Sequence, residues 1–423
     1  MELMKKLVGV IVGALLVVAG YVCWTLLRPL PLLTPSVKLQ TIDAQPFTSD
    51  KLDSGRGAIG FVNPANRIVG TKTPAQSRGA IGFVNPANRE ISCRALGNGE
   101  EYATPKPTAS IAKLITAQVV LGKMPLAKGE SGPSLGLNSQ DEASYWQDLA
   151  VGGSSVQMMA GQTISQRQLL EGTLLASANN MANRLAIWAF GSMDNYRQVA
   201  SQWLRDHELA DTIIGTDASG LDPSTKSTPT DLCKILLLAS QQPILAEIMS
   251  EPEATMPSGE VIHNTNRLLG RDGVFAGKTG FTYEAGRGVV TASRRRIDGV
   301  TVIVGVVSMG NDSYNTAFRR TEQLLESSRR DIAVSQLKAN TSVGKLSSTW
   351  GASRLVTAKP VTVPYWVDSP PKSKFVHYLS DEVDSASAGS IYGQLSLGNN
   401  QINVITERTI KPASLTWRLT HPF

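Results

Sequence analysis

The longest apolar run in this sequence lies near its beginning, where Leu7 to Leu27 form 21 uncharged and mostly apolar positions. A helix of that length spans the hydrocarbon core of a bilayer. Lys5 and Lys6 precede the run and only Arg28 follows it, which favours a cytoplasmic N-terminus and an exported body. A cleaved signal peptide is the alternative, but it would have a shorter apolar run and a clean small-residue cleavage site. We therefore expect residues 1–28 to form a retained single-pass membrane anchor.

Helical and strand patterns alternate through the middle of the chain. Apolar residues recur at helical spacing from Pro107 to Leu121, and Thr108 is a candidate N-cap. A capping-box pattern at Ser165–Gln168 begins another helix. Further helices are expected at 180–190, 193–207, 230–241 and 314–337, and adjacent antiparallel strands at 287–296 and 300–309. Helices inserted among strands predict an α+β domain, an antiparallel sheet with a helical lobe, over residues 55–338.

The segment between the apolar run and this domain contains four prolines and no sustained periodicity, so residues 29–54 are expected to form a linker. Residues 56–67 then recur letter for letter as residues 78–89. Only two copies exist, which favours a local duplication over a solenoid. Each copy reads as a short strand and a turn. Because the second copy runs on into 91–96, we assign it to the core sheet and expect the first copy to be an edge strand or an ordered loop.

The last part of the chain changes character again. Short alternating segments separated by turn residues predict a small all-β domain over residues 339–423. The clearest of these segments are 361–363, 394–397 and 402–405, with a hairpin turn at 398–400. Neither a catalytic pattern nor a C-terminal amphipathic helix is expected there, so a spacer or binding role is all that this domain suggests.

Composition narrows the possible chemistry. Cys23 lies in the apolar run, so the other two of the three cysteines, Cys93 and Cys233, could form at most one bridge. The favoured expectation is two buried, reduced thiols. The four histidines are scattered, which argues against zinc and against a Ser-His-Asp triad. The net charge of +6 comes without aromatic interleaving or a long basic stripe, so nucleic acid is not an expected partner. We expect no metal and no other cofactor.

Three short motifs carry the chemistry: Ser110-Ile-Ala-Lys113, Ser177-Ala-Asn179 and Lys278-Thr-Gly280. With Ser110 in the first turn of a helix, Lys113 at i+3 lies on the same face and can reach the serine oxygen. A serine hydroxyl needs a base to become a nucleophile, and a lysine serves only if its pKa is depressed by desolvation or by a nearby cation such as Lys278. The helix N-terminus would favour a developing oxyanion.

Each motif alone has an ordinary structural explanation. Ser-x-x-Lys on a helix is usually a solvated pair, and Ser177 and Asn179 also suit a helix-capping turn. Lys278-Thr-Gly280 could be a simple β-turn. Together and in this order, the three motifs match the set known from penicillin-binding proteins and class A β-lactamases. They indicate an acyl-transfer enzyme in which lysine activates serine.

Longer segments around these motifs resemble the serine D-Ala-D-Ala carboxypeptidases, the low-molecular-mass penicillin-binding proteins of peptidase S11 type. The resemblance spans about residues 78–335, and the C-terminal domain resembles the family's β-rich appendage more loosely. It rests on the segments 107–116, 175–182, 218–222, 227–232 and 277–282. The family resemblance implies a β-lactamase/transpeptidase-like fold. Ala178 stands where family members often have glycine, and the duplicated block lies outside the family pattern.

By this resemblance Ser110 is the acylated nucleophile and Lys113 its base. Ser177 would relay protons and Asn179 would position the substrate. Lys278 and Thr279 would bind the terminal D-alanine carboxylate, and Gly280 would let the backbone approach the substrate. The backbone N–H groups of Ser110 and Phe281 would form the oxyanion hole. The implied substrates are peptidoglycan stem peptides ending in D-Ala-D-Ala, and β-lactams would acylate the same serine outside the cytoplasm.

Other functions remain open on the same motifs. A class A-like β-lactamase would need a glutamate for deacylation; Glu208 lies in roughly the right part of the chain but has no supporting motif. DD-endopeptidase or transpeptidase activity is possible because the motifs do not specify the acceptor. An inactive muropeptide-binding protein is disfavoured by the intact Ser110, Lys113 and Lys278.

Overall fold

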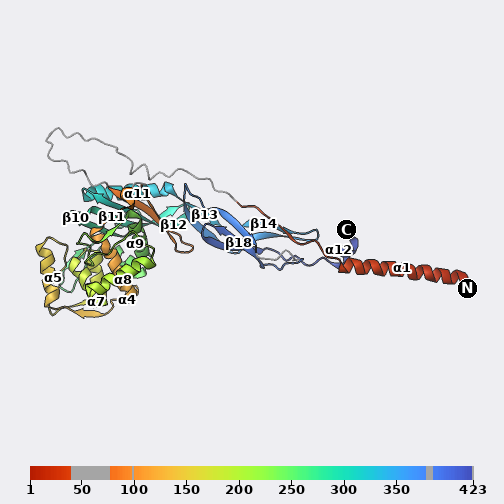
Figure 1. The fold of residues 1–423 in the computed structure, drawn as a ribbon, viewed down its shortest axis with the longest axis horizontal. Coiled ribbons are helices and arrows are strands. Elements are labelled where there is room, and N and C mark those ends of the chain that lie inside the picture. The colour runs from red at the N-terminus through yellow and green to blue at the C-terminus, as the bar shows by residue number, and fades with distance from the viewer. Residues whose placement is uncertain (40–76, 98–99, 378–383, 422–423) are drawn as a thin grey trace, which may run out of the picture. The chain divides into compact units, whose positions relative to one another are not determined.

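The computed structural model describes residues 1–39, 77–97, 100–377 and 384–421. The chain divides into two compact units, one of residues 1–44, 335–365 and 369–423, the other of residues 45–334 and 366–368. In the first unit, helix α1 (Glu2–Leu27) contains the apolar run and has the length and composition of a membrane span, with a mean hydropathy of 2.4 (Figure 1). The first copy of the duplicated block lies outside the described residues.

The expected linker contains a strand instead. β1 (Thr34–Val37) pairs antiparallel with β14 (Ser342–Ser347), with Thr34 opposite Ser347. β1 is an edge strand of a six-stranded sheet ordered β1-β14-β15-β19-β18-β17. A proline is tolerated at such an edge because its missing N–H leaves no ladder bond unmade. The prolines led to the prediction of a linker, whereas residues 34–37 form a strand of the C-terminal sheet.

The rest of this sheet confirms the all-β character expected of the C-terminal residues. β15 (Ala352–Thr357), β17 (Ser373–His377), β18 (Ile391–Leu397) and β19 (Asn400–Thr406) complete it. Gly398 turns the β18–β19 hairpin with a positive φ of 57°. A six-residue helix, α12 (Leu415–Thr420), follows, although no C-terminal helix was expected. It contacts the end of α1, where the Tyr21 hydroxyl donates to the Leu419 carbonyl at 2.8 Å.

The second unit is built on a five-stranded antiparallel sheet ordered β10-β11-β12-β2-β3. These strands are β10 (Val274–Thr282), β11 (Gly286–Ile297), β12 (Val300–Asn311), β2 (Arg78–Val84) and β3 (Ile91–Ala95). β2 is the second copy of the duplicated block and is buried throughout, which confirms its assignment to the core sheet.

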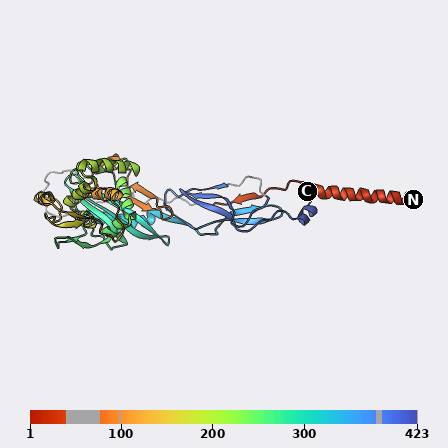
Figure 2. The same ribbon diagram turned by 90° about the horizontal axis from the view of Figure 1, so that it is seen from below.

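Helices cover both faces of this sheet (Figures 1 and 2). On one face lies α11 (Tyr314–Asp331), whose apolar side packs Phe318 and Leu324 onto the strands. On the other face lies α9 (Pro229–Gln241), which leads into the helical lobe. α11 was expected to run to residue 337, but β13 (Ile332–Leu337) follows it, because alternate residues there are buried at the period of a strand.

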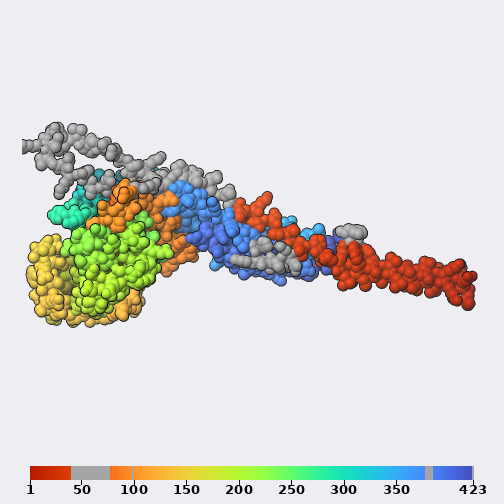
Figure 3. All heavy atoms as spheres, viewed as in Figure 1, coloured from red at the N-terminus to blue at the C-terminus, as the bar shows by residue number. Residues whose placement is uncertain are grey.

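The helical lobe contains the remaining long helices. They are α4 (Lys113–Lys123), α5 (Ser139–Ala150), α6 (Gln166–Leu174), α7 (Asn179–Phe190), α8 (Met193–Asp206) and α10 (Pro243–Ser250). The capping box at Ser165 is confirmed, since its hydroxyl accepts from the backbone N–H of Gln168. In the space-filling view α5 forms an exposed edge of the lobe (Figure 3). Outside the long helices and the two larger sheets, the shorter elements along the whole chain are α3 (Glu100–Ala103), β4 (Lys106–Pro107), β5 (Ser134–Gly136), β6 (Thr163–Ser165), β7 (Lys226–Ser227), β8 (Glu253–Thr255), β9 (Val261–His263) and β16 (Val361–Trp366).

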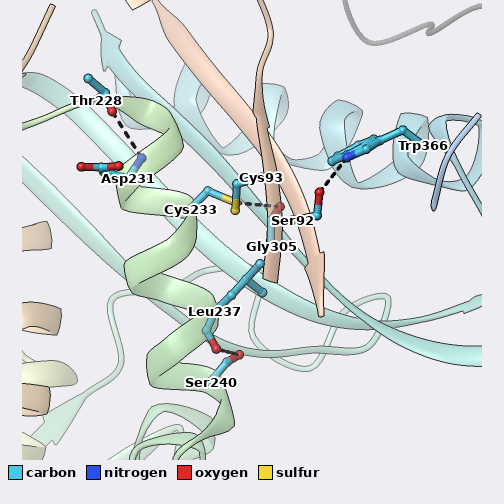
Figure 4. The surroundings of a disulfide bond; sticks show 9 residues. All are labelled: Ser92, Cys93, Thr228, Asp231, Cys233, Leu237, Ser240, Gly305 and Trp366. Atoms are coloured by element: carbon cyan, nitrogen blue, oxygen red, sulfur yellow. Dashed lines mark hydrogen bonds between the residues drawn. A yellow bond between two sulfur atoms is a disulfide. The ribbon is translucent and has the colours of Figure 1, made fainter. Parts of the chain in front are cut away.

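A disulfide joins the sheet to the helical lobe, contrary to the expectation of two reduced thiols. Cys93 on β3 and Cys233 on α9 are bonded, with their Cα atoms 6.2 Å apart (Figure 4). Gly82 on the neighbouring strand β2 provides the space for this bond, because a Cβ at that position would lie 2.4 and 2.5 Å from the two sulfur atoms. Cysteine spacing could not reveal this pairing, because it depends on how α9 packs across the sheet.

Candidate active site

The first motif forms a 3₁₀ turn, Ala109–Ala112, and α4 begins only at Lys113. The expected N-cap at Thr108 makes no side-chain cap; its hydroxyl donates to the carbonyls of Ala109 and Thr225 instead. Ala109 has a positive φ of 47°, which is rare for a residue with a side chain and marks a strained turn. This turn holds Ser110 at the surface of a cleft while its neighbours are buried.

Lys113 is fully buried behind Ser110. Its Nζ lies 2.8 Å from Ser110 Oγ, 2.8 Å from Asn179 Oδ1 and 2.9 Å from the carbonyl oxygen of Ser219. An amide oxygen and a carbonyl can only accept, whereas a serine hydroxyl can also donate. A neutral Lys113 amine therefore donates its two N–H bonds to Asn179 and Ser219, and its lone pair is left for the Ser110 proton.

Burial lowers the pKa of Lys113 to about 7, because the buried ammonium loses its hydration. The carboxylates of Asp217 and Asp148 oppose this shift by favouring the charged form. Of the two causes expected for this low pKa, desolvation and a nearby cation, desolvation is the main one. The pKa of Lys278 is itself far below its usual range, first through burial and then through the charge of Lys113.

The second motif falls in the break between α6 and α7, as expected. Ser177 has a positive φ of 65°, and α7 begins at Asn179 with Ala178 at its N-cap position. Neither polar side chain of the motif therefore caps this helix. The backbone N–H of Asn179 donates to the Ser154 carbonyl at 2.7 Å, which fixes the amide side chain beside Lys113.

The third motif lies on β10, the edge strand that runs beside the Ser110 turn. Lys278 is 1% exposed and donates to the carbonyl of Thr279 at 3.0 Å. Thr279 Oγ1 donates to Thr265 Oγ1 at 2.8 Å. A Cβ at Gly280 would lie 3.1 Å from the Thr108 carbonyl, so glycine allows the strand and the turn to approach closely.

The three motifs meet in one cleft of about 540 Å³. Six of the eight residues identified from the sequence line it: Ser110, Ser177, Asn179, Thr279, Gly280 and Phe281. Lys113 and Lys278 lie buried beneath its wall. Among the residues that the structure describes, no group of three or more His, Cys, Asp or Glu side chains is placed to hold a metal ion.

A tight turn at 217–221 completes the lysine site and was not assigned a role from the sequence. The carboxylate of Asp217 accepts from the Ser219 hydroxyl and from the backbone N–H groups of Gly220 and Leu221, the last two at 3.1 Å. Gly220 has a φ of 74°, and a Cβ there would lie 2.2 Å from the Ala109 carbonyl. The Asp-x-Ser-Gly pattern is the signal that could have indicated this turn.

Further cleft residues had no signal in the sequence. Val151 follows α5, Tyr283 follows β10 and Tyr314 begins α11, so the three reach the same cleft only through the tertiary fold. Val151 is 73% exposed and Tyr283 93% exposed, so both stand at the rim. Tyr314 is half-buried at the start of α11.

Comparison with known proteins identifies this arrangement. A family model described as D-alanyl-D-alanine carboxypeptidase, peptidase S11, matches residues 92–312, just over half of the chain. The chain belongs to this family of serine hydrolases. It is 33% identical over 226 residues to the D-alanyl-D-alanine carboxypeptidase DacB2 of Mycobacterium tuberculosis, covering 51% of this chain and 72% of that protein. It is 28% identical over 196 residues to the D-alanyl-D-alanine endopeptidase of Escherichia coli, covering 44% and 58% respectively.

Solved structures share the fold. A peptidoglycan synthesis regulatory factor, PBP3 of Streptococcus pneumoniae, matches with a TM-score of 0.61 at 19% identity, covering 78% of this chain and 98% of that one. Penicillin-binding protein 5 of Haemophilus influenzae matches with a TM-score of 0.56 at 19% identity, covering 81% and 99%. The expected family and fold class are thus confirmed.

Proposed function

We propose that this protein removes the terminal D-alanine from peptidoglycan stem peptides ending in D-Ala-D-Ala. The observation that carries the proposal is the contact between Lys113 Nζ and Ser110 Oγ, 2.8 Å, at a cleft that also contains Thr279. A buried amine with a pKa of about 7 is a competent base near neutral pH. The fixed acceptors Asn179 and Ser219 direct its lone pair to the serine.

Acylation begins when Lys113 takes the Ser110 proton and Oγ bonds to the carbonyl carbon of the penultimate D-alanine. The backbone N–H groups of Ser110 and Phe281 stabilise the oxyanion that forms. Collapse breaks the C–N bond, and the leaving amine receives the proton through Ser177. D-Alanine departs, and water then hydrolyses the ester, which returns Ser110 to its hydroxyl form.

The far end of the leaving residue carries a carboxylate. Thr279 would donate to this carboxylate. Lys278, the residue before Thr279 on β10, has a buried amine beneath the cleft wall. Binding of an anion would favour protonation of Lys278, since an opposite charge nearby stabilises the ammonium form. Gly280 supplies the space that an extended peptide needs between β10 and the Ser110 turn.

The same serine would be acylated by β-lactams, whose amide and carboxylate can occupy the same positions. Glu208, the candidate deacylating residue of a class A-like β-lactamase, is exposed and is not among the described residues that line the cleft. This supports slow release of the acyl group over β-lactamase turnover. DD-endopeptidase activity is a second candidate, because two relatives bear that name.

We also propose that α1 anchors the protein in the cell membrane with its body outside the cytoplasm. The charge bias around the apolar run supports this orientation. The Cys93–Cys233 disulfide supports it independently, since such bonds persist in oxidising compartments and are rare in the cytosol.

The proposal is tested with the full-length protein in detergent. D-Alanine release is measured from a pentapeptide ending in D-Ala-D-Ala, alongside covalent labelling by a fluorescent penicillin. We expect release and labelling by the wild type and neither by Ser110→Ala. Labelling that survives this substitution would remove Ser110 as the nucleophile, and rapid β-lactam hydrolysis without D-alanine release would favour the β-lactamase.

A further inference from the structure

Three hydroxyl groups from separate parts of the chain line one cleft. Tyr314, the first residue of α11, lies close enough to Thr279 on β10 for the two side chains to interact. Thr279 in turn donates to Thr265, which lies between β9 and β10. All three residues line the cleft, and Thr279 belongs to the third motif. Tyr314 and Thr265 have no part in the mechanism given above.

Two arginines hold positive charge around Tyr314. The guanidinium of Arg287 lies 4.1 Å from the ring centroid of Phe281 and donates to the Asp312 carbonyl at 2.7 Å. Arg267 lies 5.4 Å from the ring of Phe318 and donates to Asn315 Oδ1 at 3.2 Å. Both charges favour the phenolate form of Tyr314, but burial outweighs them and raises the pKa of its hydroxyl. Tyr314 therefore keeps its proton and remains a donor in a positive field.

These hydroxyl groups can change hydrogen-bond partners. Each hydroxyl can donate one hydrogen bond and accept others, so Thr279 need not donate to Thr265 at all times. A carboxylate only accepts, so its arrival would turn the protons of Thr279 and Tyr314 toward it, with Thr265 donating to Thr279. A neutral amide at the same place has no net charge for the positive charges of the two arginines to attract. The cluster therefore favours an anionic end group over a neutral one.

We propose that Tyr314 is a specificity-determining residue that makes this site prefer a free C-terminal carboxylate to an amidated or extended C-terminus. Its hydroxyl donates to the carboxylate of the leaving residue beside that of Thr279. The inference rests on the proposed function and deepens it, because it explains how carboxypeptidase cleavage would be favoured over endopeptidase cleavage at one catalytic serine.

The test compares two peptides that differ only in a free or an amidated C-terminus, both ending in D-Ala-D-Ala. The readout is the ratio of their kcat/KM values for release of D-alanine or D-alaninamide by the full-length protein. Losing a hydrogen bond to a charged group costs about 1.5–3 kcal/mol, which is roughly a tenfold to hundredfold change. For Tyr314→Phe we expect the ratio to fall by about tenfold or more, mainly through a higher KM for the acid.

Tyr283→Phe is the matched control, because it removes a tyrosine hydroxyl at the rim of the same cleft. Its effect on the two peptides should be equal. Thr265→Val is the second variant, and it should lower the ratio less than Tyr314→Phe does, while Thr265→Ser restores it. An unchanged ratio in both Tyr314→Phe and Thr265→Val, or an equal fall in Tyr283→Phe, would overturn the assignment.

A parallel measurement separates this inference from the proposed function. Benzylpenicillin and its methyl ester differ in the same way as the two peptides, and both are used to acylate the serine. If the wild type cleaves neither peptide, the proposed function fails. The ratio of the two acylation rates then still reports on Tyr314, and it should fall in Tyr314→Phe. No change in that ratio would count against the assignment.

Discussion

The carboxylate of Asp217 acts on Lys113 both through its charge and through the Ser219 carbonyl that it positions. Its negative charge raises the pKa of the lysine, against the larger effect of burial. Its oxygens bind the turn whose Ser219 carbonyl lies 2.9 Å from Lys113 Nζ. The lysine is thus held in place by the same group that limits how far its pKa falls.

The first prediction concerns pH. The neutral form of Lys113 is the base, so acylation should rise with pH through about 7 and then level off. The measurement is the second-order rate of labelling by a fluorescent penicillin across about pH 5–9. A rate that keeps rising toward the pKa of an ordinary lysine would show that Lys113 is not the base or is not desolvated.

The second prediction concerns the two carboxylates that favour charged Lys113. Asp148→Asn removes one negative charge, so the pKa of Lys113 should fall further and the acid limb of the rate profile should move to lower pH. Asp217→Asn should move it in the same direction but also reduce the maximal rate, because the 217–221 turn loosens. A shift to higher pH in the Asp148 variant would contradict the assigned electrostatics.

The third prediction concerns Gly220. A Cβ at its φ of 74° would lie 2.2 Å from the Ala109 carbonyl, so Gly220→Ala strains the turn that holds Ser110. We expect the free energy of unfolding to fall by about 1–3 kcal/mol from the strained backbone alone. The acylation rate should also fall, by more than this loss of stability accounts for, because Ser110 is displaced. Gly122→Ala is the control, since it lies in α4 with nothing within 4 Å of its Cβ. That variant should be neutral or stabilising by up to about 1 kcal/mol.

The fourth prediction concerns the disulfide. Cys93→Ser or Cys233→Ser should lower the free energy of unfolding by about 2–5 kcal/mol, as should a reductant acting on the wild type. Denaturant unfolding followed by tryptophan fluorescence measures the effect. Cys23→Ser removes the free cysteine of the described residues and serves as the control. Equal stability of the oxidised and reduced protein would mean that the bond does not constrain the chain.

Sequence reasoning succeeded where the signal was local. The capping box at Ser165, the helix at 230–241 and the paired strands near 287–309 all depend on short-range patterns, and the structure contains them. It failed where distant segments decide the outcome. β1 is a strand only because β14 lies beside it, and Cys93 meets Cys233 only because α9 packs across the sheet.

The candidate site divides in the same way. The residues of the three motifs could be identified from their type and order in the sequence, and the structure brings the motifs to one cleft. Tyr314 and Thr265 belong to no motif, and they reach Thr279 only through the tertiary fold. The low pKa of Lys278 could not be predicted either, because it depends first on how deeply its amine is buried.

The disulfide closes a covalent loop of chain, since its two cysteines are separated by 140 positions. Ser110, Ser177 and Asp217 all lie inside this loop, and Lys278 and Tyr314 lie outside it. A protease that cuts once between Cys93 and Cys233 therefore leaves the nucleophile tethered to the rest of the enzyme. Such a nicked molecule would migrate as one covalent species on a gel until a reductant separates its two fragments.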